Sequence, residues 1–192
     1  MIQRLSESFY RVSRGRVALA ATVFFVVFTS IVRPAQARKA GTYTNGAPTP
    51  DTSFFYTSHD LHSWAQAYGA VGRSDYVMAR FTFDVVWPLA YTLFLVTVLS
   101  WLLGRFLATD GRWRRVNVIA VLPLMFDYAE NVAASVVISR YPAGTPVLAD
   151  VVTVFTMAKW VTLVGAFILI AWVGCALLVR RWRTTVPKKV GV

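Results

Sequence analysis

Cysteine and acidic residues are both scarce in this sequence. The chain of 192 residues has one cysteine, Cys175, and only 9 Asp and Glu residues in total. A single cysteine cannot form an intrachain disulfide, and it excludes dithiol chemistry and cysteine metal clusters. The sequence also lacks a nucleophile elbow, a zinc signature, a phosphate-binding loop and a redox motif. We therefore expect no cofactor and no bound metal, which leaves proton transfer as the chemistry open to an enzyme of this sequence.

Charged residues of both signs are also few, and hydrophobic residues are abundant. Only 15% of the residues are charged, whereas a typical soluble domain has about 25%. Hydrophobic residues make up 56% of the chain, and its mean hydropathy is +0.52. A soluble core of this size does not need so much apolar surface, so we infer that lipid is part of the solvent.

Four apolar runs organise the chain. They are Val17–Val32, Val85–Leu102, Val116–Ser139 and Val151–Val179. A spanning helix needs about 17–25 apolar residues, and the last three runs reach that length. We predict an all-α integral membrane protein, an antiparallel bundle of four transmembrane helices at about 15–33, 78–104, 114–140 and 147–180. Residues 1–183 would form a single transmembrane domain, followed by a flexible cytoplasmic tail at 184–192.

The basic residues lie mainly at the ends of the apolar runs. The net charge is +11, and the basic flanks are densest before the first run, between the second and third, and after the fourth. The positive-inside rule then predicts a protein of the bacterial plasma membrane with both termini in the cytoplasm. An even number of spans agrees with this, because it puts both termini on the same side. Because these residues do not form one soluble basic face, we expect membrane lipids as partners and no nucleic acid.

The first apolar run has a second interpretation. A basic leader precedes it and Ala35-Gln36-Ala37 follows it, a pattern that is typical of a cleaved signal peptide. However, the apolar region of a signal peptide usually has about 7–15 residues, and this run is slightly longer. Arg33 also lies between the run and the candidate cleavage site. We favour an uncleaved first span.

The segment 33–77 is the one long external loop that we predict. Its first half is rich in glycine and proline, which indicates irregular chain. Thr57 and Asp60 have the spacing of a helix capping box, and apolar residues recur at helical spacing after them. We predict a short amphipathic helix at about 58–68 that lies at the membrane–water interface. A cap at Ser74 then predicts a helix that runs without interruption into the second span.

Polar side chains interrupt the apolar runs. The three in the third run share one helical face, because they are three and four residues apart. A carboxylate in hydrocarbon costs about 2.5–3.5 kcal/mol on insertion scales, so it normally faces a partner, a cavity or a substrate. Counting the rise along each helix brings polar residues of the second and fourth spans to a similar depth. We predict a polar pocket formed by Asp84, Tyr91, Asp127, Glu130, Asn131 and Lys159.

Structural roles for these residues stay open at this point. Lys159 and an acidic partner could form an ion pair that only locks helix packing, although interhelical polar contacts in membranes contribute only about 0.6–2 kcal/mol. Asp84 could instead pair with Arg80, four residues earlier, at the surface. His59 and His62 could bind a metal, but two histidines without a third ligand form a weak site.

The order of several polar and aromatic residues resembles a known family. The pattern comprises Tyr68-Gly69, Gly72-Arg73, Tyr76, Asp84-(x3)-Pro88-(x2)-Tyr91, Asp127-(x2)-Glu130-Asn131, Tyr141-Pro142 and Lys159-Trp160. It resembles small bacterial four-span integral membrane proteins with a D-x-x-E-N motif in the third span, over about residues 54–175. The resemblance implies a four-span fold in which these positions belong together, and it implies no activity or substrate.

Three classes of function fit this pattern. The first is an intramembrane enzyme that performs cofactor-free acid–base chemistry on a lipid-soluble substrate, as an isomerase, cyclase or hydrolase. Asp127 or Glu130 would be its acid and base, Lys159 the charge partner, and Asn131 and Tyr91 the orienting groups. Such an enzyme predicts an enclosed, mostly apolar pocket of about 300–1,000 Å³.

The second class is a small transporter or a protein that binds an ion or another ligand, alone or as an oligomer. A pore continuous to the cytoplasm would favour it, whereas the lack of an inverted repeat argues against a monomeric carrier. The third class is an accessory subunit of a membrane complex, which would dock a partner through small residues. We favour the enzyme.

Overall fold

The computed structural model describes residues 1–109 and 111–185 of the chain. Within this part of the chain every regular element is a helix. The elements are α1 (Ile2–Val12), α2 (Gly15–Tyr43), η1 (Pro50–Thr52), α3 (Ser58–Arg80), α4 (Phe83–Phe106), η2 (Arg112–Val121), α5 (Leu122–Ser139) and α6 (Pro146–Thr185). Most of the predicted cytoplasmic tail lies outside the described residues, since they end at 185.

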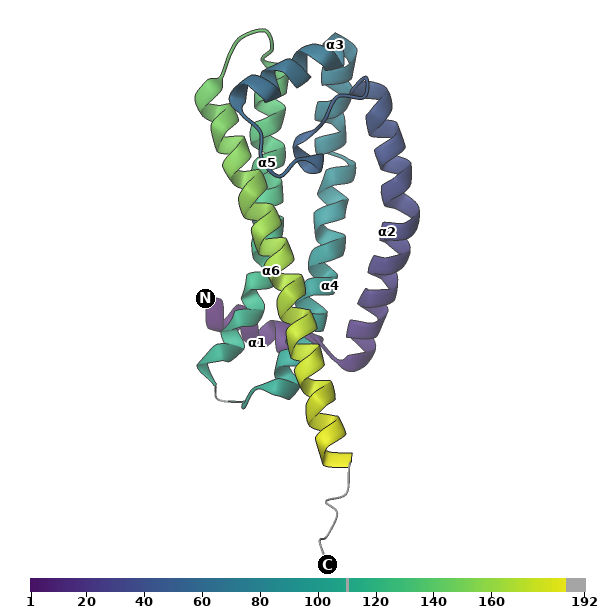
Figure 1. Ribbon diagram of the computed structural model, residues 1–192. Coiled ribbons are helices and arrows are strands. Elements are labelled where there is room, and N and C mark those ends of the chain that lie inside the picture. Colours follow the sequence, from purple (N-terminus) through teal and green to yellow (C-terminus); the bar gives the residue numbers. More distant parts are fainter. Residues whose placement is uncertain (110, 186–192) are drawn as a thin grey trace, which may run out of the picture.

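The prediction of an all-α chain with four membrane-type helices is confirmed. Four helical stretches are long and apolar enough to cross a membrane: Gly15–Tyr43, Ser58–Phe106, Trp113–Ser139 and Pro146–Thr184. In Figure 1, helices α2, α4, α5 and α6 lie side by side, the first part of α3 crosses one end of them, and α1 lies at the other end. Helix α5 packs mainly on α6 and α3, and α2 packs mainly on α4 and α3. We refer below to the α3 end and the α1 end of the molecule.

Helix α2 is longer than the sequence indicates. We expected a span that ended near residue 33 and irregular chain after it, but the helix continues through Pro34 to Tyr43. Proline lacks one backbone N–H donor, and the residues after Pro34 include good helix formers such as alanine, arginine and lysine, which favour continuation of the helix. The added turns carry Gln36 and Ala40 to the level of the candidate site.

The third apolar run does not form one α-helix. Its first part is the 3-10 helix η2, and α5 begins only at Leu122, with Pro123 in its first turn. A proline at this position is compatible with an α-helix, because the first amides have no partner inside the helix. The α-helical part of the third span is therefore shorter than the predicted range of about 114–140.

Helix α3 bends at Gly69 and ends before the second apolar run. Gly69 has φ 67°, a left-handed conformation that glycine adopts without steric cost. The predicted capping box is present at the start of α3, where the Thr57 hydroxyl accepts a hydrogen bond from the Asp60 amide. The prediction of one uninterrupted helix into the second span was wrong, because the chain leaves the helical conformation at Phe81 and Thr82. This break separates the end of α3 from the start of α4.

Two apolar clusters fill the bundle at different levels. The cluster near the α3 end includes Leu61, Tyr76 and Ile138, and the cluster toward the α1 end includes Leu99 and Val173. Ala120 of η2 belongs to the cluster toward the α1 end, and Ala133 of α5 belongs to the cluster near the α3 end. The acidic residues of α5 lie between these two positions in the sequence, so the apolar clusters flank the polar residues on both sides.

Helix α1 was not predicted, and a buried asparagine holds it in place. Asn117 of η2 is fully buried; its amide donates to the Ser6 carbonyl at 3.2 Å and to the Ser100 hydroxyl at 3.1 Å, and its carbonyl accepts from the Ser6 hydroxyl at 2.7 Å. Tyr10 of α1 also donates to the Arg114 carbonyl at 2.7 Å, and burial raises the pKa of this tyrosine above its usual range. These contacts join α1, α4 and η2.

We expect Asn117→Leu to destabilise the protein by about 1–3 kcal/mol, the usual cost of leaving buried polar groups without partners. The substitution leaves the buried Ser6 and Ser100 hydroxyls without the hydrogen bonds to Asn117. Thermal unfolding in detergent measures the change. Ser63→Ala serves as the control because it removes an exposed hydroxyl, and an equal melting temperature for both variants would contradict the expectation.

Candidate functional site

A small cavity of about 140 Å³ lies among helices α2 to α6, below the loop that carries η1. Its polar wall includes Asp51, Arg80, Asp84, Tyr91, Asp127 and Lys159. Its apolar wall includes Phe83 and Trp87 from α4 and Trp160 and Leu163 from α6. This differs from the enclosed, mostly apolar pocket of about 300–1,000 Å³ that we expected of an enzyme, because the cavity is smaller and charged side chains form much of its wall.

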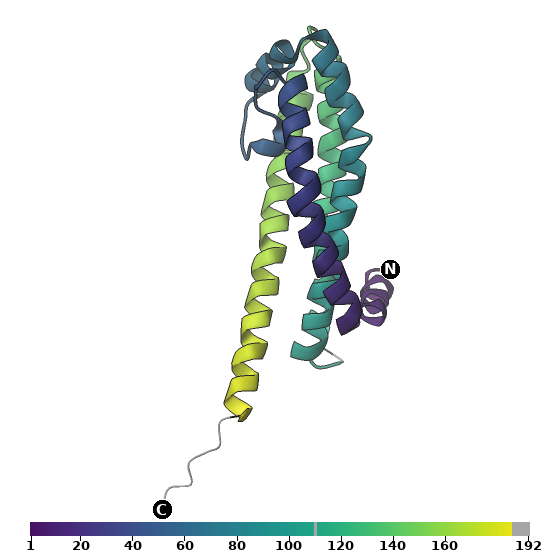
Figure 2. The same cartoon turned by 90° about the vertical axis from the view of Figure 1, so that its right-hand side faces the viewer.

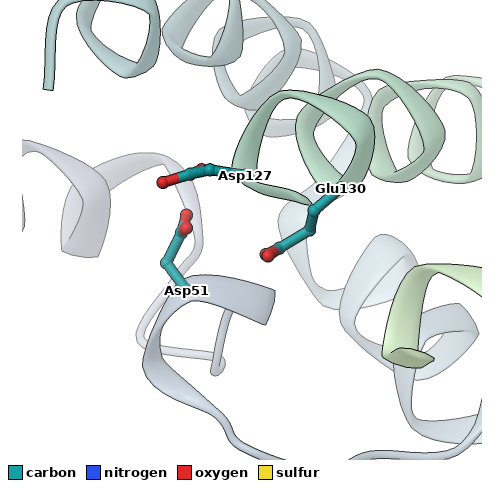
Figure 3. Close-up of side chains that lie close together, drawn as sticks. All are labelled: Asp51, Asp127 and Glu130. Carbon is teal, nitrogen blue, oxygen red and sulfur yellow. The ribbon is translucent and has the colours of Figure 1, made fainter. Parts of the chain in front are cut away.

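The ammonium group of Lys159 lies among three carboxylates. Its Nζ is 2.7 Å from Glu130 Oε2, 3.0 Å from Asp51 Oδ1 and 3.9 Å from Asp127 Oδ1. Figure 3 shows the three acidic side chains converging, with Asp127 and Glu130 coming from α5 and Asp51 from η1. Lys159 is buried in α6, so it joins the distant segment η1 to the consecutive helices α5 and α6.

Arg80 is the second buried cation of the site. Its guanidinium forms ion pairs with Asp51 and, at 2.7 Å, with Asp84 Oδ2. It also lies over the ring of Tyr76, 4.7 Å from the ring centre. We had considered an Arg80–Asp84 pair at the surface, but the structure buries both residues, with 6% and 8% of their surface exposed. The break between α3 and α4 lies between them in the chain.

Asp127 is held by two hydrogen bonds at the wall of the cavity. The Tyr91 hydroxyl donates to Asp127 Oδ2 at 2.9 Å, and the Asn131 amide donates to Asp127 Oδ1 at 3.2 Å. The same amide approaches the Asp84 carbonyl oxygen at 3.5 Å. Tyr91, Asn131 and Lys159 together therefore fix the position of the Asp127 carboxylate.

The structure brings all six predicted residues into one network, but it divides them into two groups. Asp84, Tyr91, Asp127 and Lys159 line the cavity, whereas Glu130 and Asn131 lie behind this wall. A buried oxygen of Glu130, Oε1, and the Asn131 carbonyl oxygen have no hydrogen-bond partner within the described chain. The sequence left open whether Asp127 or Glu130 is the reacting group. In the structure Asp127 lines the cavity, whereas Glu130 lies behind it against Lys159.

Asp51 is the site residue that sequence reasoning missed. It lies in the short helix η1, in a segment that we expected to be irregular chain. Thr49 and Thr52 form a capping box around it, and Pro50 occupies the first helical position. An acidic residue framed by a proline and two threonines was a visible signal for a local turn, but nothing in its spacing indicated contact with the spans.

The loop around Asp51 is attached to the helices on both sides. The Tyr68 hydroxyl donates to the Pro48 carbonyl at 2.6 Å, and the Tyr56 hydroxyl is 2.7 Å from the Thr156 hydroxyl of α6. Burial raises the pKa of Tyr56 above the usual tyrosine range, so this hydroxyl keeps its proton. These contacts fix the loop backbone and position the Asp51 side chain over the cavity.

The charges of the site do not cancel formally. Four carboxylates, those of Asp51, Asp84, Asp127 and Glu130, share ion pairs with two cations, Arg80 and Lys159, within the described residues. These ion-paired groups carry a formal charge of −2, in surroundings where charges are costly. The exposed Arg33 also lines the cavity and offsets part of this charge. Hydrogen bonds from Tyr91 and Asn131 to Asp127 stabilise part of this excess.

Oxygen atoms of Asp51, Asp127 and Glu130 lie within 4.8 Å of one another, a spacing compatible with a metal ion. The Lys159 ammonium already lies among them, so a metal would have to displace the protein's own cation. His62 packs against the ring of Tyr141, with 4.8 Å between ring centres. Among the described residues, neither histidine belongs to a group of three metal-ligating side chains.

The chain matches no protein-family model, no curated protein and no solved structure. The resemblance to four-span proteins with a D-x-x-E-N motif stays a prediction. Function must therefore be argued from the geometry of the site.

Proposed function

We propose that the chain crosses a membrane as an antiparallel bundle, with the first part of α3 at the outer interface and both termini in the cytoplasm. The four membrane-type helices and the direction of the chain in Figure 1 support this arrangement. Figures 1 and 2 show the end of α6 extending beyond the other helices at the α1 end, where Arg180 and Arg183 lie. Basic residues at this end match a cytoplasmic surface.

We infer that the cavity opens sideways toward lipid, along the border of α2 and α6. Residues of α2, such as Gln36 and Ala40, and residues of α6, such as Trp160 and Leu163, line the same cavity. Helix α2 packs mainly on α4 and α3, so its border with α6 is the less tightly packed side. A lipid-soluble molecule can reach the charged wall along this border without crossing water.

The cavity is a pocket and not a pore. Toward the α1 end the space between α4 and α6 is filled by the apolar cluster that includes Phe94, Leu95, Leu99, Ala166 and Val173. A transport pathway would need a polar route through this level. The packing therefore favours a ligand that enters and leaves on one side.

We propose that the protein is an intramembrane enzyme that performs acid–base chemistry without a cofactor on the polar end of a lipid-soluble substrate. The observation that carries this proposal is the Asp127 carboxylate, held at the cavity wall by Tyr91 and Asn131 and placed 3.9 Å from Lys159. A fixed carboxylate of this kind suits the role of general base, and a neighbouring cation stabilises negative charge that develops on the substrate.

The proposed step needs no co-reactant. Asp127 takes a proton from a carbon of the substrate, the electron pair shifts along the substrate, and Asp127 returns the proton to a second atom. Isomerisation and cyclisation of an unsaturated lipid both balance in this way, whereas hydrolysis would also consume water. Tyr91 supports Asp127 through its hydrogen bond, and Glu130 positions Lys159.

The test is conversion of a membrane lipid extract by the purified protein, followed by mass spectrometry of substrates and products. We expect Asp127→Asn to reduce conversion by about 10²–10⁴-fold, the usual contribution of a general base, while the protein still folds. Asp75→Asn is the matched control, because Asp75 is exposed on α3 and not among the residues that line the cavity. Conversion that survives Asp127→Asn would refute the assigned role.

A further inference from the structure

Asp51 binds two buried cations that come from different helices. One of its carboxylate oxygens pairs with Arg80 of α3 and the other with Lys159 of α6. The side chains of Arg80 and Lys159 are only 6% and 5% exposed, whereas that of Asp51 is 31% exposed. A loop carboxylate thus bridges two buried cations that the helices supply, each of which also pairs with a helix carboxylate.

The loop backbone need not move for Asp51 to leave this site. The contacts of Pro48 with Tyr68 and of Tyr56 with Thr156 hold the loop on both sides. We infer that rotation of the Asp51 side chain would free Arg80 and Lys159 toward the cavity, because all three residues line it. A ligand carboxylate that replaces Asp51 would leave the charge of the site unchanged, whereas a phosphate monoester would bring up to about one further negative charge. The three further carboxylates therefore favour a carboxylate head group over a phosphate.

The rest of the cavity fits the remainder of an amphiphile. Trp87, Trp160 and Leu163 give it an apolar wall, and Arg33 at its rim lies over Trp87, 5.5 Å from the ring centre. A volume of about 140 Å³ accommodates a head group and not a lipid chain. The chain would extend along the border of α2 and α6 into lipid.

We propose that the ligand of this cavity is a single-chain amphiphile with an anionic head, a carboxylate or a phosphate, which replaces Asp51 on Arg80 and Lys159. This inference rests on the same site as the proposed function and names its substrate class, and it concerns binding alone. Asp51 acts as a built-in competitor that bridges the two cations when no ligand is present, while Arg80 stays paired with Asp84 and Lys159 with Glu130.

Quenching of tryptophan fluorescence by a brominated fatty acid tests the proposal, because Trp87 and Trp160 line the cavity. The full chain in detergent micelles is titrated at about pH 8, where a free carboxylic acid is ionised. We expect Asp51→Asn to raise the apparent affinity for dibromostearate about tenfold, because the ligand then competes with a neutral amide. A factor of this size is typical of one charge-assisted hydrogen bond. The methyl ester of the same acid should quench wild type and variant equally.

Two further variants locate the effect. Trp160→Phe in the Asp51→Asn background should remove part of the added quenching, and Asp75→Asn should leave the wild-type affinity unchanged. Displacement of the quencher by palmitate or by dodecyl phosphate supports the proposal and identifies the preferred head group. Equal affinity of Asp51→Asn and wild type for the acid, or equal displacement by dodecanol, would overturn it.

This experiment separates the inference from the enzymatic proposal, since it reads binding without turnover. A protein that binds the acid in this way but converts no lipid contradicts only the proposed enzyme. Conversion of a neutral lipid that depends on Asp127, without any binding of the acid, contradicts only the inference about the head group.

Discussion

Replacing Lys159 by methionine is expected to cost about 3–5 kcal/mol of stability, the usual result of removing one partner from a buried ion pair. Methionine has a similar length but no charge, so it leaves Glu130 and Asp127 facing each other without the cation between them. Because Asp51 also loses its contact with α6, the loop over the cavity should loosen as well. Thermal unfolding in detergent, followed by tryptophan fluorescence, measures the loss.

A double-mutant cycle shows whether the loss comes from stranded charge. Glu130→Gln removes one of the two charges that Lys159→Met leaves behind, so the double variant should be more stable than the single Lys159→Met variant. Coupling between contacting residues usually amounts to about 0.5–3 kcal/mol. Lys39→Met is the control, because Lys39 is exposed on α2, and it should leave the melting temperature unchanged. Strict additivity of the two site substitutions would show that the pair is not coupled.

Gly72→Ala is expected to destabilise the protein although alanine is the better helix former. Gly72 packs against the end of α2, and a Cβ atom there would overlap the carbonyl oxygen of Tyr43. Alanine gains about 0.8–1 kcal/mol over glycine in a helix interior, whereas overpacking against a rigid neighbour typically costs about 1–3 kcal/mol and occasionally more. Since the neighbour is backbone, we expect the overpacking cost to exceed the gain, and Gly72→Val to lose still more.

Other helical glycines provide the matched control for this prediction. Gly165 and Gly174 lie in α6, and apart from the neighbouring residues and backbone of α6 itself no described atom lies within 4 Å of a Cβ added at either position. Their replacement by alanine should stabilise the protein or leave its melting temperature unchanged. If Gly72→Ala behaves like these two substitutions, α2 and α3 do not approach each other as closely as the structure indicates.

The sequence was sufficient to predict the all-α character and the four membrane-type helices, because long apolar runs have few alternatives to a helix in lipid. It was less informative about where helices break. Pro34 lies inside α2 without ending it, and the chain leaves the helix at Phe81 and Thr82, which are not typical helix-breaking residues. Helix boundaries of this kind depend on packing with neighbouring elements, which periodicity does not report.

The candidate site was predictable where polar residues were unexpected, that is, inside the apolar runs. Asp127, Glu130 and Lys159 were recognisable because a charged residue inside an apolar run needs a partner. Asp51 was not, because an aspartate in a polar loop needs no explanation. Its place between Arg80 and Lys159 follows from the path of the loop after the unexpectedly long α2.

Residue order alone thus established which side chains are too polar for lipid and must find partners inside the protein. The choice among those partners belongs to the tertiary structure: Asp127 lines the cavity, Glu130 lies behind it beside Lys159, and Asp51 closes it from outside. The physical reason is that the cost of burying a charge is a property of each residue, whereas its compensation depends on distances between segments that the chain brings together only on folding.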